Sequence, residues 1–396
     1  MKCLYRNFCL IDGTGKEPVE QAAMAVEDGR ILWAGPAKQW TGQADQEICL
    51  GGGYVMPGLA ECHTHMTLLT LNIPEQVKLS YTETVVGAVQ NLENWLKQGV
   101  TLIRDVGSFK VPSIELVLRD MVRDGKIPGP TVYASGRIIT MTGGHGCFID
   151  RTYDGVDEVR KAAREIIWER ADLIKTIATG GVGTEGTDVN AYQYNEEELR
   201  AIVVEAKKAG KKVAVHAHGA QGIKNALRAG VDSIEHGTLL DEEGIELMVQ
   251  NKAYLVPTFA ITRQMMENAR ENPGSIPESM LEKEKTLAGL HEANFARAYK
   301  AGVKIACGTD VNPRLMPWAT ARELGFMMEA SGMSAMEAIV SATGAAADLI
   351  GAGRDYGTLE AGKYADFLVM DENPLEDIGA VCRLREVYKT GRRVER

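Results

Sequence analysis

The feature that most constrains the fold is an alternation, between residues 54 and 310, of short apolar segments with longer segments of helical period. Amphipathic runs such as residues 83–99, 196–210 and 242–251 separate the apolar segments. Alternation of strand and helix predicts parallel strands joined by crossover helices. The predicted strands are residues 54–63, 100–106, 130–136, 173–179, 212–218, 231–237, 253–259 and 303–310.

Eight strands alternating with helices are typical of an α/β fold, the (β/α)8 TIM barrel. A doubly wound open sheet is the alternative, but no GxGxxG follows the first predicted strand, which disfavours it. The two ends of the chain differ from the middle, because both consist of short strands with turn signals such as Asp12-Gly13 and Asp28-Gly29. We therefore expect a small β-sandwich from residues 1–56 and 355–396, and a barrel from residues 57–354.

The composition excludes several classes of partner. The net charge of the 396 residues is -10, which disfavours nucleic acid and anionic membranes, since both select for basic surfaces. No stretch approaches ~18 consecutive apolar residues, so no membrane span is expected, and the amino-terminal sequence does not resemble a signal peptide. The seven cysteines include no CxxC pair, which fits reduced thiols in the cytoplasm.

Histidines gather at the ends of the predicted strands. Side chains two residues apart on a strand point the same way, and the carboxyl ends of barrel strands meet at one rim. Neutral imidazoles and a carboxylate are natural ligands of zinc and similar divalent ions. The sequence therefore predicts a metal site at this rim. The residues concerned are His63, His65, His216, His218 and His236, together with Asp310 at the end of the eighth strand.

Lys175 is unusual because it lies within an apolar strand, where a charged ammonium is costly to bury. Burial and nearby cations lower the pKa of a lysine and free its amine. A neutral amine can take up CO2 and become an anionic carbamate that bridges two metal ions. Alternatively, Lys175 extends to solvent or pairs with an acid such as Asp105.

With these residues in place, the chain resembles the amidohydrolase superfamily in its binuclear form. Residues 55–65, VMPGLAECHTH, resemble the opening motif of the family, with Glu61 where Asp is usual. Residues 357–375, GTLEAGKYADFLVMDENPL, resemble its closing segment. Residues 174–182, 213–219 and 231–238 are most similar to the branch of Xaa-Pro and Xaa-Arg/Lys dipeptidases. That branch is related to imidazolonepropionases and includes ochratoxin-type amide hydrolases.

The resemblance implies a role for each residue. His63 and His65 would bind the more buried of two divalent ions, with Zn2+ as the implied metal. Lys175, as a carbamate, would bridge to a second ion held by His216 and His236. Asp310 would bind the buried ion and carry a proton. The related pattern Val-His-Ala-Glu-Asn favours His216 as the ligand and leaves His218 as a substrate contact.

The implied reaction is amide hydrolysis by a hydroxide that bridges the two ions, releasing a carboxyl-terminal amino acid from a dipeptide or N-acyl amino acid. Asp310 would transfer the proton to the leaving amine, and His145 would steady the oxyanion. His218 and Tyr254 would contact the substrate. The glycine-rich residues 178–188 could cradle a carboxylate, and Arg263 could reach one.

Other functions stay open on the sequence. A cyclic amidohydrolase of the hydantoin or imidazolone kind is one alternative, and an ochratoxin-like amide hydrolase is another. A deaminase is disfavoured because Gly219 and Gln221 stand where such enzymes place Glu. A non-catalytic binding protein is the reading from a different class, and metal content would distinguish it. We also expect a possible homo-oligomer and a structural role for His291.

Overall fold

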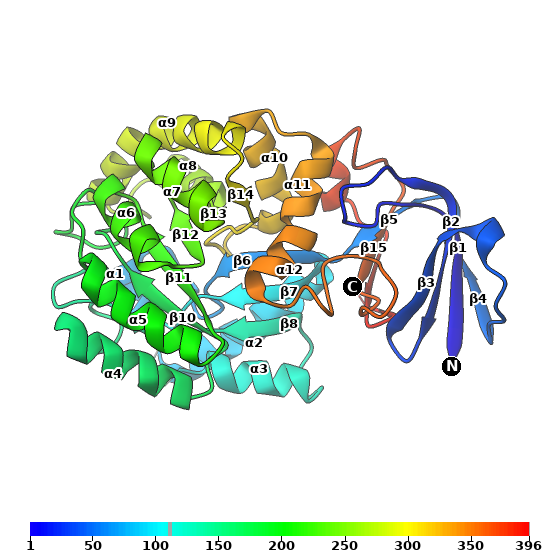
Figure 1. The fold of residues 1–396 in the computed structure, drawn as a ribbon, viewed down its shortest axis with the longest axis horizontal. Helices are drawn as coiled ribbons and strands as arrows, with labels where there is room; N and C mark the ends of the chain where they lie inside the picture. The colour runs from blue at the N-terminus through cyan, green and yellow to red at the C-terminus, as the bar shows by residue number, and fades with distance from the viewer. Residues whose placement is uncertain (110–112, 396) are drawn as a thin grey trace.

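The computed structural model of the chain describes residues 1–109 and 113–395. It has a larger lobe of strands surrounded by helices and a smaller lobe of strands that contains both ends of the chain (Figure 1). This arrangement confirms the prediction of an α/β barrel with a β-sandwich built from the two termini.

The smaller lobe is a sheet in which strands from the two ends of the chain are interleaved. Strand β5 pairs in parallel with β1 and antiparallel with β15, and thereby joins the amino-terminal strands to the carboxy-terminal ones. The sheet order is β17-β16-β15-β5-β1-β2-β3, and β4 pairs with β1. The strands are β1 (Lys2–Leu10), β2 (Val19–Glu27), β3 (Arg30–Pro36), β4 (Gln46–Cys49), β5 (Tyr54–Pro57), β15 (Phe367–Met370), β16 (Glu386–Lys389) and β17 (Arg392–Arg393).

The core of this lobe lies between strands that are not neighbours in the sheet. The Tyr5 ring packs edge-on against Phe367 and Tyr388, with ring centroids 5.1 and 5.4 Å apart. The Tyr5 hydroxyl donates a 2.9 Å hydrogen bond to the carbonyl of Gly391. The sheet therefore folds over itself around aromatic side chains from both ends of the chain, as expected for two inner sandwich faces.

The strands of the larger lobe form two parallel sheets, β6-β7-β8 and β9-β10-β11-β12-β13-β14. Backbone hydrogen bonds join these sheets at both ends, from Cys62 to Cys307 (2.9 Å) and from Asp172 to Ala134 (2.9 Å). The strands therefore form a ring. Their bounds are β6 (Leu59–Thr64), β7 (Val100–Asp105), β8 (Thr131–Ala134), β9 (Ile138–Ile139), β10 (Leu173–Ile177), β11 (Lys212–Ala217), β12 (Ser233–His236), β13 (Tyr254–Val256) and β14 (Lys304–Ile305).

The first predicted strand, residues 54–63, is divided in the structure. Its first half is β5 in the smaller lobe, and its second half lies in β6 of the barrel. Gly58 lies between the two halves. The position requires glycine, because a Cβ atom there would meet the Thr101 side chain at 2.2 Å. An uninterrupted apolar run in sequence thus serves two different sheets.

Helices pack around the ring, and hydrogen-bonding residues mark where several of them begin. Ser80 and Glu83 form a capping box at the start of α2, and Asn195 and Glu198 form one at the start of α5. No helix in residues 1–109 or 113–395 is long and apolar enough to cross a membrane. The helices are α1 (Ile73–Gln76), α2 (Tyr81–Lys97), α3 (Glu115–Arg123), α4 (Gly155–Trp168), α5 (Glu196–Lys208), α6 (Ala220–Ala229), α7 (Glu242–Asn251), α8 (Phe259–Glu271), α9 (Glu278–Lys300), α10 (Ala319–Ser331), α11 (Ala335–Ser341) and α12 (Gly344–Ile350).

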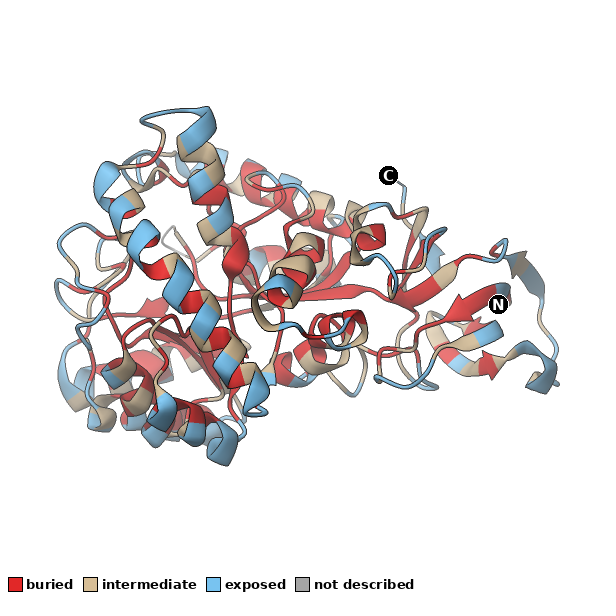
Figure 2. Ribbon diagram, turned by 90° about the horizontal axis from the view of Figure 1, so that it is seen from above, coloured by how far each residue is buried: buried red, intermediate tan, exposed pale blue. Residues whose placement is uncertain are grey.

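The barrel strands are almost entirely buried, whereas the outer faces of the helices are exposed (Figure 2). All five residues of β10 are buried, including Lys175. Strands covered on both faces read as continuous apolar runs, which explains why the sequence shows them clearly. A polar side chain at such a strand end is held in a rigid, water-poor setting.

Candidate active site

A cavity lies at the carboxyl ends of the barrel strands, and one side of it is polar. The polar side chains come from five strands, β6, β10, β11, β12 and β14, or from the loops that follow them, and β6 and β11 each contribute two. The carboxyl ends of barrel strands meet at one rim. We call this set the floor of the cavity. It consists of His63, His65, Lys175, His216, His218, His236 and Asp310. All six metal ligands predicted from the sequence thus line one cavity, together with His218.

His63 is oriented by a buried chain of charges. Its Nδ1 lies 2.8 Å from Oε2 of Glu235, and Arg104 donates to both oxygens of that carboxylate at 2.8 and 2.9 Å. His63, Glu235 and Arg104 are each at most 2% exposed. Because a carboxylate can only accept, Nδ1 of His63 carries the proton, and Nε2 offers its lone pair to the cavity.

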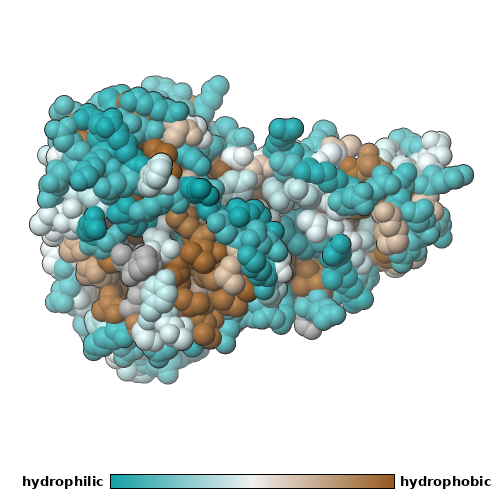
Figure 3. All heavy atoms as spheres, turned by 90° about the horizontal axis from the view of Figure 1, so that it is seen from below, coloured by the Kyte–Doolittle hydropathy of each residue, from teal (hydrophilic) through white to brown (hydrophobic). Residues whose placement is uncertain are grey.

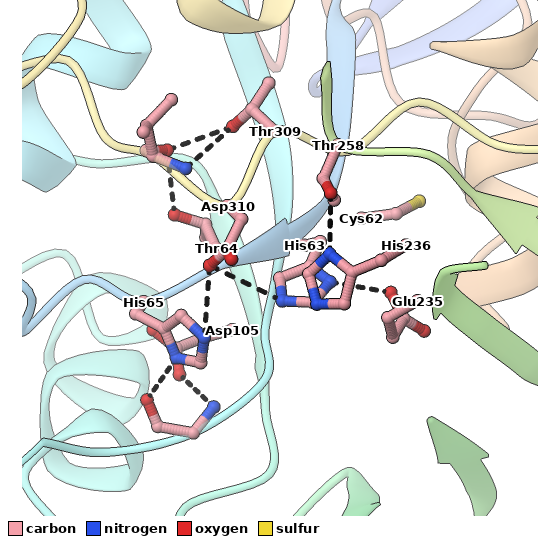
Figure 4. Close-up of polar contacts among 12 residues, drawn as sticks. Cys62, His63, Thr64, His65, Asp105, Glu235, His236, Thr258, Thr309 and Asp310 are labelled. Atoms are coloured by element: carbon pink, nitrogen blue, oxygen red, sulfur yellow. Dashed lines mark hydrogen bonds and ion pairs between the residues drawn. The ribbon is translucent and has the colours of Figure 1, made fainter. Parts of the chain in front are cut away.

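Two further floor imidazoles, those of His65 and His236, are also oriented through Nδ1. Nδ1 of His65 donates to the carbonyl of Gly107 (2.8 Å), which leaves Nε2 unprotonated, 3.4 Å from Oδ1 of Asp310. Nδ1 of His236 lies 2.7 Å from the Thr258 hydroxyl. The labelled side chains of Figure 4 show His63, His65 and His236 turned toward Asp310 and one another. Such outer hydrogen bonds fix ring orientation in metal sites.

Burial keeps these imidazoles neutral. Desolvation lowers the pKa of His65 and of His218 to about 3, and holds the pKa of His63, His216 and His236 well below the usual value. Neutral rings have lone pairs available for a cation. Donor atoms of His216, His218 and His236 lie within 4.8 Å of one another, as do those of His63, His236 and Asp310. The donor set therefore fits divalent metal ions.

Lys175 is 2% exposed and lines the cavity. Its amine makes no hydrogen bond or ion pair with any residue of the described part of the chain. Asp105, the alternative partner, instead accepts from the backbone amides of Met66 (2.7 Å) and Gly107 (3.1 Å). Burial lowers the pKa of Lys175 to about 8. A buried, unpartnered amine with a lowered pKa among neutral imidazoles fits a lysine that becomes a carbamate.

Asp310 faces His63 and His65 from the loop after β14, with its side chain 21% exposed. Burial raises the pKa of Asp310 to about 7, and the positive charge of Lys175 opposes that rise. Asp310, His236 and Thr258 adopt positive φ angles of 58°, 71° and 59°. Such conformations are uncommon outside glycine and cluster at functional sites, where they direct a side chain away from the strand.

Glu61, the departure from the family's usual Asp, joins the first strand to the segment after the last. Its carboxylate accepts from the backbone amides of His63 (2.9 Å) and Thr309 (3.0 Å), and from the hydroxyls of Thr309 (2.9 Å) and Thr320 (2.8 Å). These four hydrogen bonds fix the backbone beside His63 and Asp310. The longer Glu side chain thus has a structural role in this chain.

His145 lines the cavity next to the floor. Its Nδ1 lies 2.7 Å from the Thr184 hydroxyl, and its ring stacks on His216 with centroids 4.5 Å apart. His291, expected to be structural, also lines the cavity, and its Nε2 donates to the carbonyl of His236 (2.9 Å). Both histidines therefore contact the floor.

Tyr254 was expected to face the barrel mouth, and the structure corrects this. Its hydroxyl donates to Asp348 (2.5 Å), beside Lys304, and Tyr254 does not line the cavity. Tyr254 is the first residue of β13, so it lies at the amino end of the strand, opposite the rim. Arg263 is also absent from the cavity lining, and it pairs with Glu292 at 2.9 Å on the surface.

The sequence did not identify the residues that support the floor. Glu235 and Arg104 orient His63, and Thr258 and Thr238 orient His236 and His218. A glutamate directly before a strand-end histidine was the visible signal for Glu235. The arginine lies on β7, distant in sequence, and only the ring of strands brings it to Glu235.

The fold and the floor together indicate a barrel hydrolase with a site that fits divalent metal ions. Comparison with known proteins agrees: the model of the Amidohydrolase family matches residues 54–394. The chain is 33% identical to the ochratoxinase of Aspergillus niger, over 93% of this chain and 81% of that protein. It is 25% identical to an imidazolonepropionase of Acidiphilium cryptum, over 96% of this chain and 95% of that protein.

Among solved structures, a Xaa-Pro dipeptidase with bound methionine in the active site is 32% identical. It superposes with a TM-score of 0.90 over 100% of both chains. This chain belongs to the amidohydrolase family, as the sequence motifs predicted, and it is a hydrolase acting on carbon–nitrogen bonds.

Proposed function

We propose that the chain is a dipeptidase or carboxypeptidase that releases the carboxyl-terminal amino acid of a dipeptide or N-acyl amino acid. The observation that carries the proposal is the amine of Lys175, which is unpaired within the described part of the chain and buried among neutral imidazoles and Asp310 in one cavity. The similar Xaa-Pro dipeptidase, which binds methionine in its active site, supports this substrate class.

The proposed cofactors are two Zn2+ ions and a carbamate on Lys175. The floor residues His63, His65, His216, His236 and Asp310 would be the remaining ligands. Bound divalent ions supply a polarised substrate carbonyl and a water that ionises near neutral pH. His218 also lies within ligand distance of its neighbours, so either fifth-strand histidine has the geometry to bind.

The chain's own residues would do the rest. Asp310, with its pKa raised to about 7, both takes up and releases a proton near neutral pH, as an acid-base residue must. His145, fixed by Thr184, would donate from Nε2 to the developing oxyanion. His218, fixed by Thr238 at 2.8 Å, would contact the substrate.

A second candidate is an ochratoxin-like amide hydrolase. The 33% identity to ochratoxinase favours it, as does the large apolar part of the cavity surface. A cyclic amide, as in imidazolonepropionases, has weaker support, because the identity to the imidazolonepropionase of Acidiphilium cryptum is 25%.

The test is a measurement of metal content followed by a substrate screen. Zinc-loaded protein would be offered dipeptides, N-acyl amino acids, aromatic N-acyl amino acids and a hydantoin. We expect about two ions per chain and release of free amino acid from the first two groups. Hydrolysis of the hydantoin alone would contradict the dipeptidase proposal and favour a cyclic amidohydrolase. A metal content far below one ion per chain, together with no turnover of any substrate, would contradict the proposed hydrolase function.

The setting of the enzyme is also proposed. All seven cysteines are free, which suits a reducing cytoplasm. We also propose that the chain forms a homo-oligomer. We further propose domain boundaries at residues 56/57 and 354/355. Size-exclusion chromatography with light scattering would test the former.

A further inference from the structure

The cavity has a second side that is apolar. We call it the apolar wall; it consists of Leu68, Leu71, Val182, Met265, Met280 and Leu287, which form part of one buried cluster. Figure 3 shows hydrophobic residues gathered in a hollow of the larger lobe. Among the described residues that line the cavity, Lys175 is the sole lysine and no arginine occurs. Apart from the floor, the cavity thus offers no cation to a substrate carboxylate.

One ionisable side chain interrupts the apolar wall: Glu284 of α9. It is 6% exposed. Its Oε2 accepts a 3.1 Å hydrogen bond from the hydroxyl of Thr262, on α8. Within the described chain it has no other hydrogen bond and no ion pair. Burial raises the pKa of Glu284 to about 7. A carboxyl group in such a place costs folding energy unless a partner arrives.

Three other buried glutamates show how this chain supplies a buried carboxylate with partners from the protein itself. Glu61 accepts four hydrogen bonds, as described above. Glu235 accepts from Nη2 of Arg104 with both of its oxygens. Glu323 accepts from the backbone amides of Phe259 and Ala260, each at 2.7 Å. Among the described residues, Glu284 has a single hydrogen-bond partner, the Thr262 hydroxyl, and it faces a cavity. The missing partner is therefore expected to come from the cavity side.

Glu284 is also held in position. Its neighbour Lys283 donates to the carbonyls of Gly181 (3.3 Å), Thr184 (3.2 Å) and Thr187 (2.8 Å). These bonds attach α9 to the glycine-rich loop after β10, whose Thr184 hydroxyl also contacts His145. The carboxyl of Glu284 is therefore placed at a set position relative to the floor, as a recognition group should be.

We propose that Glu284 recognises a cationic nitrogen on an otherwise apolar substrate. The proposal rests on the proposed amide hydrolysis and specifies its substrate class. A substrate ammonium would supply the charge that the protein does not, and a charge-assisted hydrogen bond in a low-dielectric wall is strong. The nitrogen has two possible sources: the free α-ammonium of a dipeptide, or a basic side chain on the released amino acid.

Two substrate pairs distinguish these sources. Leu-Leu is compared with N-acetyl-Leu-Leu, and N-acetyl-Leu-Lys with N-acetyl-Leu-norleucine. Each pair differs in one positive charge. Zinc-loaded wild type is compared with Glu284→Gln, which keeps the shape, and with Glu282→Gln, an exposed control on the same helix. We expect Glu284→Gln to lower kcat/KM about tenfold or more for the charged member of one pair. Its effect on the uncharged member should stay within about threefold.

A binding measurement without turnover accompanies the kinetics. Hexylammonium should raise the Tm of wild type and Glu282→Gln but not of Glu284→Gln, whereas hexanol should not discriminate among the three. Equal effects of Glu284→Gln on both members of each pair, or equal hexylammonium shifts, would overturn the proposal while leaving amide hydrolysis intact. If wild type hydrolyses none of the four substrates but hexylammonium still discriminates, the proposed reaction fails and the recognition stands.

Discussion

The floor and the apolar wall of the cavity are built in opposite ways. The floor sits on strand ends, and His63, His65 and His236 each make an Nδ1 hydrogen bond that sets the orientation of the ring. The wall is made largely by helices and loops, and includes flexible Met265 and Met280. The floor is thus preorganised by polar networks, whereas the wall is apolar and adaptable. Among the described residues, Glu284 is the single carboxyl that the wall presents to the cavity.

The largest expected effect comes from removing the unpaired amine on the floor. Lys175→Ala should lower kcat/KM by about a thousandfold or more, because metal ions contribute several kcal/mol to the transition state and each 1.36 kcal/mol is a factor of ten. Propionate should partly restore the activity by replacing the carbamate. Lys285→Ala, an exposed lysine on α9, is the control. Full activity of Lys175→Ala would show that the floor does not use a bridging lysine.

The support beneath the floor should show in stability as well as in metal binding. Glu235→Ala leaves the buried guanidinium of Arg104 without its carboxylate, which should cost about 3–5 kcal/mol in the free energy of unfolding. It also frees Nδ1 of His63, so metal affinity should fall about 10–100-fold. Chemical denaturation and metal titration measure the two effects. The double variant Arg104→Met/Glu235→Ala should recover part of the stability but not of the affinity.

On the apolar wall, replacing the buried carboxyl should stabilise the fold, in contrast to the destabilisation expected for Glu235→Ala. The pKa of Glu284 is raised from 4.5 to about 7, so between these pH values the unfolded state releases its proton and the folded state keeps it. Wild type should therefore lose stability relative to Glu284→Gln as pH rises through this range, by on the order of 3 kcal/mol. Denaturation at pH 4.5, 6 and 8 tests this. If the difference in unfolding free energy between wild type and Glu284→Gln stayed constant over these pH values, the Glu284 carboxyl would not have a raised pKa in the folded protein.

The smallest effect is expected outside both regions. Tyr254→Phe removes the hydroxyl that bonds Asp348 and should cost about 1 kcal/mol in stability. Its kcat/KM should match wild type, because Tyr254 does not line the cavity. Steady-state kinetics and thermal unfolding measure the two. A large loss of kcat/KM in Tyr254→Phe would instead support the substrate contact that was predicted from the sequence.

Much of the floor could be predicted because two simple rules act locally. Residues two apart on a strand share a direction, and parallel strands end at one rim. His63 with His65, and His216 with His218, follow from these rules. Tyr254 does not, because it is the second residue of the predicted strand 253–259 and the first residue of β13, which places it at the amino end of the strand. It therefore lies at the end of the barrel opposite the rim, where its hydroxyl bonds Asp348.

By itself, the sequence determined the alternation that makes a barrel, the sandwich from both termini, and the family to which the chain belongs. Each of these depends on periods and motifs that are local in the chain. Only the tertiary structure decided that Arg104 supports Glu235. It also decided that, within residues 1–109 and 113–395, Lys175 has no partner and Glu284 faces the cavity with one hydrogen bond. The physical reason is that a buried charge is defined by what surrounds it, and those surroundings come from segments 20 to more than 100 residues away.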